Sequence, residues 1–208
     1  SSRFRLFTDV FFNVHSAWSL HGKRFSFLYL SRSEKYETTE RKCVWIFRSD
    51  CYIRRCIECC RFAFHLLEAG KEVQVKENLS ILPLESIHTE IPGYAFNYIL
   101  RRDGKTILYA SDTGGYPPAM LDILLAQKYD CVVMEGTFGL GAECEGHMCL
   151  HKNIQMRDLL TEHGCWVGEP RMYLTHICPH WAPPHDEYAA VVAEEGMVLG
   201  YDGQSIEI

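Results

Sequence analysis

The chain contains 208 residues, of which 21 are Lys or Arg and 27 are Asp or Glu, so its formal net charge at pH 7 is -6. With 47% hydrophobic and 23% charged residues, it has the composition of a globular protein with a hydrophobic core, which excludes a disordered or fibrous chain. The acidic balance excludes a strongly basic nucleic-acid binder but leaves a local basic groove open, and no apolar run approaches the ~18 residues of a membrane-spanning helix.

The N-terminal region does not have the pattern of a signal peptide. Asp9, Asn13 and His15 interrupt the only apolar run near the start of the sequence. The ten cysteines have no regular spacing, and a chain of this size does not need disulfides for stability. We therefore expect mostly reduced thiols in a soluble, cytoplasmic protein without contact with a membrane.

The elements before residue 70 are weakly marked. The pattern there favours one short helix over residues 61–69, ended by Gly70, because Gly commonly follows the C-terminus of a helix. Beyond residue 70, apolar runs separated by turn residues predict strands, with Asp103-Gly104 as a hairpin turn. The predicted strands in this stretch cover residues 73–75, 79–84, 95–100 and 106–110.

In the last hundred residues, helical and strand patterns alternate. Helices are predicted over residues 117–127, 150–163 and 186–195, strands over 131–134 and 171–174, and a final hairpin over 197–201 and 205–208 around Asp202-Gly203. This alternation is typical of an α/β domain in which helices pack on a sheet.

Polar residues follow four of the predicted strands. Asp112 and His176 come after two of the strands, Glu135 ends a third, and His88 follows the strand over residues 79–84. Ligands in layered α/β folds bind at strand ends, where loops converge on a rigid sheet. Imidazole and carboxylate suit zinc, manganese or iron, so His88, Asp112 and His176 together are candidates for a metal site.

Each of these residues has an ordinary structural explanation when it is taken alone. Asp112 before Thr-Gly-Gly is a common turn former, and His176 after a strand is more often a hydrogen-bonded core histidine. The combination is less ordinary, since a further histidine, His147, lies just before a predicted helix.

The order of these motifs resembles a known family. His88, Ser-Asp112-Thr, Glu135-Gly-Thr-Phe, Gly-His147 and Leu-Thr-His176-Ile resemble the later motifs of the metallo-β-lactamase fold superfamily, especially phosphoribosyl cyclic phosphate phosphodiesterases and ribonuclease Z-like nucleases. The match covers roughly residues 72 to 208. It implies an α/β fold, the metallo-β-lactamase-like αββα sandwich, in a single domain over residues 1–208. Residues 71–208 form its well-matched half, and residues 1–70 form a divergent, incomplete N-terminal half.

The resemblance also implies roles for individual residues. His88 would bind one metal ion, Asp112 would bridge two ions, and His176 would bind the second. His147 matches a histidine near the leaving group, where it would donate a proton or stabilise phosphate charge, and Glu135 matches an acid that would orient this histidine. In the loop after His176, His180 is a candidate for substrate contact or, as is common for a loop histidine, simply a solvated residue.

One motif of the family is missing. The superfamily has an H-x-H-x-D-H sequence after an early strand, and here the nearest segment retains only its first histidine, as His15. Ala17, Ser19 and Leu20 occupy the positions of the other three ligands. The resemblance therefore implies His15 as a fourth metal ligand and a site with two divalent ions or fewer, most simply zinc, with manganese as an alternative.

These implications give a leading function and two alternatives. The leading function is a metal-dependent hydrolase of the phosphodiesterase type, in which a metal-bridged hydroxide attacks a small phosphodiester. One alternative is a ribonuclease Z-like nuclease, which the acidic charge disfavours because RNA binding depends on Lys and Arg. The other is a noncatalytic member that uses the fold for binding. A homodimer is compatible with each of them.

A second group of candidate metal ligands lies in the N-terminal part. The spacing of Cys51, Cys56, Cys59 and Cys60 resembles a zinc knuckle or part of an iron-sulfur loop, with His65 as a further ligand. Because the next cysteine is Cys131 and glycines are lacking between them, clustered reduced thiols are the favoured interpretation.

Overall fold

The computed structural model describes residues 44–47, 63–88 and 95–208. Within these ranges the chain divides into two compact units. One contains residues 69–201 and Ile208, and the other contains the described part of residues 4–68 together with residues 202–207. Among the described residues, no helix is long and apolar enough to cross a membrane.

The smaller unit contains a parallel pair of strands. β1 (Val44–Phe47) and β2 (Ala63–Leu66) pair in parallel, with Val44 opposite Ala63. The helix predicted over residues 61–69 is therefore wrong. A short apolar run fits a strand as well as a helix, and pairing with a distant segment selected the strand here. Cys51, Cys56, Cys59 and Cys60 lie outside the described residues.

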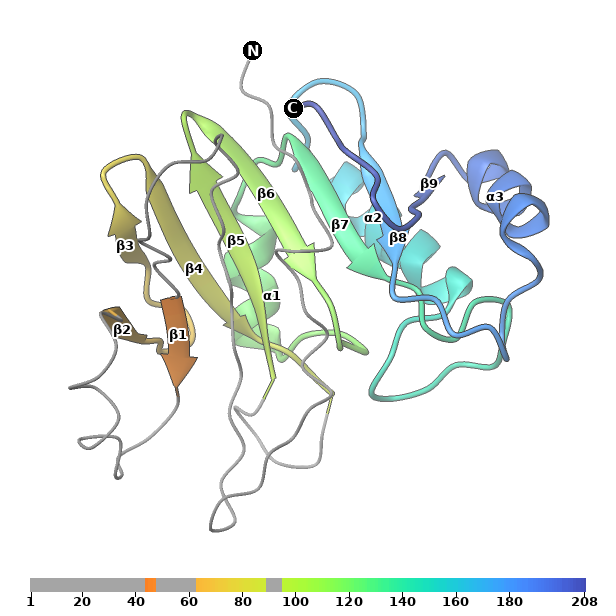
Figure 1. Cartoon of the computed structure of the whole chain (residues 1–208), viewed down its shortest axis with the longest axis horizontal. Coiled ribbons are helices and arrows are strands. Elements are labelled where there is room, and N and C mark those ends of the chain that lie inside the picture. Colours follow the sequence, from red (N-terminus) through yellow and green to blue (C-terminus); the bar gives the residue numbers. More distant parts are fainter. Residues whose placement is uncertain (1–43, 48–62, 89–94) are drawn as a thin grey trace, which may run out of the picture. The chain divides into compact units, whose positions relative to one another are not determined.

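The larger unit is built on a mixed seven-stranded sheet, shown in Figure 1. Its strands lie side by side in the order in which they occur along the chain. They are β3 (Val73–Lys76), β4 (Leu79–Glu85), β5 (Phe96–Arg102), β6 (Lys105–Ala110), β7 (Cys131–Glu135), β8 (Met172–Thr175) and β9 (Val198–Leu199). β3 to β6 are antiparallel, and β6 to β9 are parallel.

The antiparallel part confirms the predicted hairpin between β5 and β6. Arg102 pairs with Lys105, and the two residues between them, Asp103 and Gly104, have φ of 51° and 77°. Positive φ at both central residues matches the twist of the two strands, and Asp-Gly tolerates this conformation well. Because β4 and β6 are both antiparallel to β5, they point in the same direction, so their C-terminal ends share one edge of the sheet.

Each parallel connection contains a helix, in agreement with the prediction. The helices are α1 (Pro118–Leu125), α2 (Leu150–Glu162) and α3 (His185–Glu194). Pro118 begins α1, where its missing N–H costs no helical hydrogen bond, and Asp186 and Glu187 place negative charge in the first turn of α3. Figure 1 shows α1 and α2 behind the sheet. Right-handed crossovers that proceed in one direction along a sheet place helices on one face in this way.

The core of this unit lies between the sheet and its helices. Central strand residues such as Leu84, Ile99, Leu108, Met134 and Leu174 are 0% exposed. Burial of such side chains stabilises the sheet by about 1.5–3 kcal/mol each. The buried parallel strands therefore form a rigid support for the loops at their C-terminal ends.

The final predicted hairpin is wrong. β9 pairs in parallel with β8, with Leu174 opposite Leu199, and residues 205–208 form no strand. The turn at Asp202-Gly203 is present, with φ of 82° at Gly203. Local turn chemistry identified the turn but did not identify the pairing partner of the strand before it.

Candidate functional site

Three polar residues meet where neighbouring parallel strands end. Asp112 lies two residues after β6, Glu135 is the last residue of β7, and His176 directly follows β8. In the sheet register, Ala110 is opposite Met134, and Glu135 is opposite Thr175. The strand ends therefore bring these side chains to one edge of the sheet, as the sequence predicts.

Four side chains form a compact group at this edge. Asp112, Glu135, His147 and His176 each offer one ligand atom, and these atoms lie within 4.8 Å of one another. His176 Nε2 lies 3.7 Å from Asp112 Oδ1. This carboxylate oxygen is buried and lacks a hydrogen-bond partner. A buried, unpaired acceptor is costly, so Asp112 Oδ1 is suited to a cation.

The backbone at two of these residues adopts an unfavourable conformation. Asp112 has φ of 53° and His176 has φ of 58°. Non-glycine residues rarely occupy this left-handed region, and such strain concentrates at functional sites, where the surrounding structure enforces it. In both residues the conformation turns the chain sharply after a strand.

The carboxylate of Glu135 connects the members of this group. Its side chain is 0% exposed. His147 Nδ1 lies 2.9 Å and 3.0 Å from its two oxygens, and the backbone N–H of Thr113 donates to Oε1 at 2.5 Å. The Thr137 hydroxyl donates to Oε2. Glu135 therefore holds His147 directly and also fixes the residue that follows Asp112.

The ionised carboxylate of Glu135 and the protonated imidazole of His147 stabilise each other. Burial acts to raise the pKa of the Glu135 carboxyl, but hydrogen bonds from His147 and Thr137 outweigh it and hold this pKa below its ordinary value. The hydrogen bond to Glu135 raises the pKa of His147, against a smaller opposing effect of burial. The pair is thus most stable as imidazolium and carboxylate.

The three histidines of the site use Nδ1 in the same way but with different partners. His147 Nδ1 faces the Glu135 carboxylate, whereas His176 Nδ1 lies 2.8 Å from the Thr137 hydroxyl and His88 Nδ1 lies 2.9 Å from the carbonyl oxygen of Gly146. A hydrogen bond at Nδ1 fixes the tautomer and orients Nε2 as the second functional atom. Backbone carbonyls and carboxylates are both usual Nδ1 partners of histidines that bind metal through Nε2.

His88 lies beside the group rather than within it. Its ring packs edge-on against His147, with ring centroids 4.7 Å apart. The segment before it is held by hydrogen bonds from Ile87 N to Gly115 O, at 2.9 Å, and from Gly114 N to Ile87 O, at 2.6 Å. β4 therefore delivers His88 to the same edge as β6.

Two glycines permit the close approach of these loops. A Cβ at Gly114 would lie 1.6 Å from the Glu145 carbonyl oxygen, and one at Gly146 would lie 2.7 Å from the carbonyl oxygen of His88. Any side chain at either position would separate the segments that contain Asp112, His88 and His147.

The remaining predicted site residues are not in this group. His180 is exposed in the loop between β8 and α3, and His15 lies outside the described residues. Sequence reasoning gave no role to Thr137 or to Asn153. Asn153 is 0% exposed on α2 and donates from Nδ2 to the Glu135 backbone oxygen at 2.8 Å. An asparagine inside an otherwise regular helix was the only sequence signal for it.

The fold and the site define an α/β protein with a candidate metal centre at the ends of parallel strands. The sequence matches the family model described as a Beta-lactamase superfamily domain over residues 24–177. This range exceeds half of the chain, so the chain belongs to this family. The match confirms the predicted metallo-β-lactamase superfamily, whose members include metal-dependent hydrolases. It begins before residue 72, where the motif resemblance starts, and it ends just after His176.

Solved structures of low sequence identity share the fold. A diphosphatase from the PhnP family is 18% identical, with a TM-score of 0.55, and the alignment covers 75% of this chain and 53% of that one. Zinc-bound PqqB from Methylobacterium extorquens is 13% identical, with a TM-score of 0.53 and coverage of 71% and 56%. An isothiocyanate hydrolase from Delia radicum gut bacteria is 14% identical, with a TM-score of 0.56 and coverage of 80% and 67%.

The chain thus spans little more than half the length of the PhnP-family diphosphatase. The comparison with curated proteins finds no match.

The described residues fit a divalent metal ion. Asp112 provides a buried carboxylate oxygen without a hydrogen-bond partner, and His176 has its Nδ1 held by the Thr137 hydroxyl, which orients Nε2 for coordination. This mixture of oxygen and nitrogen donors suits zinc or manganese. A catalytic zinc ion keeps an open position beside three protein ligands, so Asp112 and His176 need at least one further donor.

Proposed function

We propose that this protein is a metal-dependent phosphodiesterase that acts on small phosphodiesters. The observation that supports the proposal most directly is the meeting of Asp112, Glu135, His147 and His176 within 4.8 Å at the ends of three adjacent parallel strands. The Asp112 oxygen without a hydrogen-bond partner would provide a cation site, and the imidazole held by Glu135 would provide a proton donor.

His88, Asp112 and His176 are the proposed metal ligands. A bound divalent ion, most simply zinc, would polarise a phosphoryl oxygen and make water more acidic. The three side chains would orient the phosphate at the edge of the sheet. A second ion would need donors beyond these, for which His15 is the candidate.

His147 is the proposed general acid. Its Nδ1–H donates to Glu135, so Nε2–H of the imidazolium remains to protonate the leaving oxygen. As a hydroxide adds to phosphorus and the bond to the leaving oxygen breaks, the proton moves from Nε2 to this oxygen, which leaves as an alcohol. Glu135 stays ionised throughout and holds the ring in orientation, and water restores the proton in a later step.

Charge favours a small diester over RNA as the substrate. The chain has an excess of six acidic residues, whereas RNA binding draws much of its affinity from counterion release by Lys and Arg. The acidic total is compatible with a substrate of one or two phosphates, because the local ion and His147 supply the compensating positive charge.

Metal analysis and turnover test this proposal. The purified chain should bind zinc or manganese and hydrolyse bis-p-nitrophenyl phosphate, and Asp112→Asn should abolish both. Asp103→Asn is the matched control, because Asp103 has a similar φ of 51° but lies in the β5–β6 hairpin turn. Failure to bind any divalent metal at any loading would remove the proposal. Metal binding without turnover of any diester would leave the noncatalytic alternative.

A further inference from the structure

A row of aromatic rings extends outward from the candidate metal centre. The rings of His176 and His147 have centroids 6.2 Å apart, those of His147 and Phe138 are 5.8 Å apart, and those of Phe138 and Trp181 are 5.3 Å apart. The angles between successive ring planes are only 24°, 30° and 16°. The four rings therefore lie roughly parallel, and the row leads from the cluster to the exposed side chain of Trp181.

Trp181 is exposed but is held firmly in place. Its relative exposure is 47%, and its backbone N–H donates to Cys178 O at 3.0 Å. Its carbonyl oxygen accepts from Leu140 N at 2.8 Å, so the loop after β7 is tied to the loop after β8. A Cβ at Gly141 would lie 2.8 Å from the indole ring, which shows how closely the backbone approaches it.

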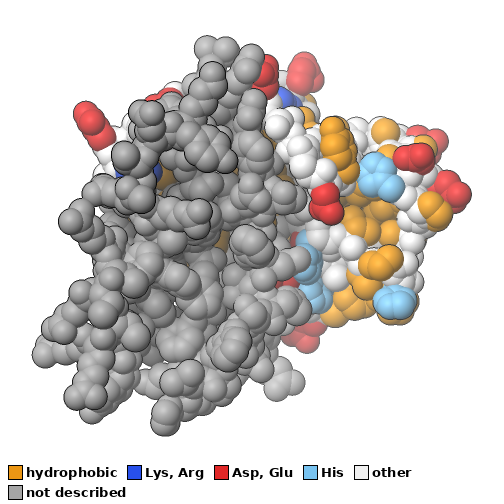
Figure 2. Space-filling view, in the orientation of Figure 1, with side chains coloured by type: hydrophobic (Ala, Val, Ile, Leu, Met, Phe, Trp, Pro, Cys, Tyr) orange, Lys and Arg blue, Asp and Glu red, His pale blue; other side chains and the backbone are white. Residues whose placement is uncertain are grey.

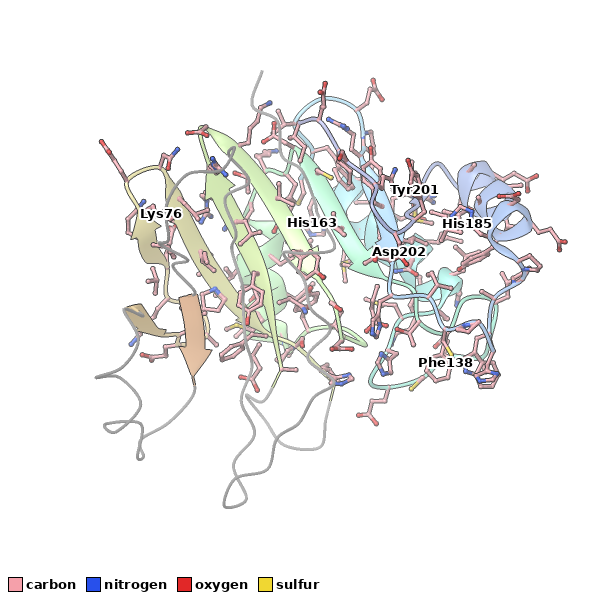
Figure 3. All side chains as sticks on the ribbon, viewed as in Figure 1. Lys76, Phe138, His163, His185, Tyr201 and Asp202 are labelled. Atoms are coloured by element: carbon pink, nitrogen blue, oxygen red, sulfur yellow. The ribbon has the colours of Figure 1, made fainter. Side chains whose placement is uncertain are left out.

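The surface around this ring is apolar next to a polar centre. Leu140 is 52% exposed, and Phe138 is partly exposed between Trp181 and His147. Figure 2 shows hydrophobic side chains and histidines side by side on the described part of the visible face, and Figure 3 shows Phe138 in the loop beyond the end of β7. Apolar walls beside a few placed polar groups are typical of small-molecule sites.

We propose that the exposed indole of Trp181, which is stacked on Phe138, forms a platform for a planar ring, most simply a nucleobase, in the leaving group of the substrate. The inference rests on the proposed function, because His147 gives its proton to the leaving oxygen and Phe138 lies directly beyond His147. A leaving group that extends from His147 toward Phe138 would reach the side of the site on which Trp181 is exposed. A rigid exposed indole offers the flat apolar surface that a base requires, without the cost of ordering a mobile side chain.

The first experiment measures ring binding without turnover. Adenosine is titrated into the metal-free protein, with saturation-transfer NMR on the adenine protons. Trp181→Ala should weaken binding by about ten-fold, in line with base–aromatic stacking, whereas Trp181→Phe should retain most of it. Tyr201→Ala is the matched control, because Tyr201 is another exposed aromatic, at 61%, and Figure 3 shows it well apart from Phe138.

The second experiment compares diesters in the metal-loaded protein. The substrates are adenosine 2′,3′-cyclic phosphate, bis-p-nitrophenyl phosphate and glycerol 1,2-cyclic phosphate, which has no aromatic ring. Trp181→Ala should raise KM about ten-fold for the adenosine diester and leave KM for the glycerol diester unchanged. An equal rise for the nitrophenyl diester would support a platform for any planar ring, and no rise would support a preference for a nucleobase.

The outcomes separate the platform from the hydrolase. Loss of adenosine binding in Trp181→Ala with no turnover of any diester would support the platform and count against the phosphodiesterase. Turnover with an equal effect of Trp181→Ala on diesters with and without an aromatic ring would overturn the platform alone. Absence of adenosine binding to the wild-type protein at millimolar concentration would also overturn it.

Discussion

At the scale of single residues, the geometry of the candidate site depends on Glu135. Its side chain is fully buried, and it orients the more exposed residues around it. It accepts hydrogen bonds from His147, from the hydroxyl of Thr137 and from the backbone of Thr113. Thr137 in turn lies 2.8 Å from His176 Nδ1. One buried carboxylate therefore orients two imidazoles and the loop of Asp112.

Replacing this carboxylate with an amide tests its importance. In Glu135→Gln, the amide NH₂ would face the donors of His147 or Thr137, so the histidines should lose their orientation. We expect metal affinity and diester turnover to fall by about 10–100-fold, as is usual when a partner that orients ligands is lost. Isothermal titration with zinc and a steady-state assay provide the measurements.

The chain contains a matched control for this variant. His151 Nδ1 lies 2.6 Å from Glu143 Oε1, in a histidine–glutamate pair whose side chains are 64% and 58% exposed. Glu143→Gln should leave metal affinity and turnover unchanged, since exposed pairs contribute little. Equal losses in the two variants would show that the buried pair has no special role.

The same pair predicts how stability depends on pH in the metal-free protein. The folded pKa of Glu135 is lowered, so its contribution is complete above the unfolded value near 4.5 and is lost as pH falls through the folded value. The folded pKa of His147 is raised, so its contribution is complete below the unfolded value near 6.5 and is lost as pH rises through the folded value. The Glu135–His147 pair therefore contributes most to the stability of the folded protein between about pH 4.5 and pH 6.5.

Urea denaturation across pH 3–9 measures this effect. Glu135→Gln should flatten the dependence on both sides of the maximum, whereas Glu143→Gln should leave the profile as in the wild type. Wild-type and Glu135→Gln profiles of the same shape would contradict the proposed ion pair.

The residues of the site differ in how far sequence can identify them. Asp112, Glu135 and His176 were predictable because they follow apolar strands, and the ends of parallel strands meet at one edge. Thr137 and Asn153 were not, since their contacts with His176 and Glu135 arise only after the loops and α2 pack together. The role of His88 as a metal ligand stays a prediction, and its packing against His147 depends on side-chain geometry that the sequence does not show.

At the scale of elements, the loops at the sheet edge fit together through glycines. Gly114 has no room for a Cβ, which would lie 1.6 Å from Glu145 O and 2.9 Å from His147 N. In Gly114→Ala the segment before His147 must move away. We expect a loss of about 1–3 kcal/mol in the free energy of unfolding, as in other overpacked sites, together with weaker metal binding.

Gly104 provides the comparison for this variant. It has φ of 77°, and a Cβ added there would have no neighbouring atom within 4 Å, so Gly104→Ala introduces backbone strain alone. It should destabilise the fold by about 1–2 kcal/mol and leave metal affinity unchanged. Urea denaturation and zinc titration of both variants distinguish the two effects. Unaltered metal affinity in Gly114→Ala would contradict the importance of the loop contact.

The elements themselves show what local sequence determines. The β5–β6 hairpin was predictable from Asp103-Gly104, because the turn fixes the pairing of adjacent strands. The partners of β9 and β2 are β8 and β1, which lie at least 15 residues away along the chain. Turn and propensity signals contain no information on such distant pairing, so a hairpin and a helix were predicted where strands form parallel pairs.

At the scale of the whole molecule, the family assignment and the missing motif must be considered together. The family match begins at residue 24, after His15, and in the predicted register Ala17, Ser19 and Leu20 replace the other three motif ligands. Among the described residues, His88, Asp112 and His176 are the proposed ligands of one ion. On this ligand set we expect one divalent ion per molecule.

Restoring the motif tests whether His15 has been placed in the correct register. The triple variant Ala17→His, Ser19→Asp and Leu20→His recreates the H-x-H-x-D-H pattern, so metal content should rise from one ion to two per chain, measured by elemental analysis after dialysis. Diester turnover should rise with it, because two ions stabilise both the attacking and the leaving oxygen. Adding Asp112→Asn to the triple variant should remove both ions, since its carboxylate is the proposed bridge. A triple variant that still binds a single ion would show that His15 does not correspond to the first histidine of the motif, while the ion held by His88, Asp112 and His176 would be unaffected.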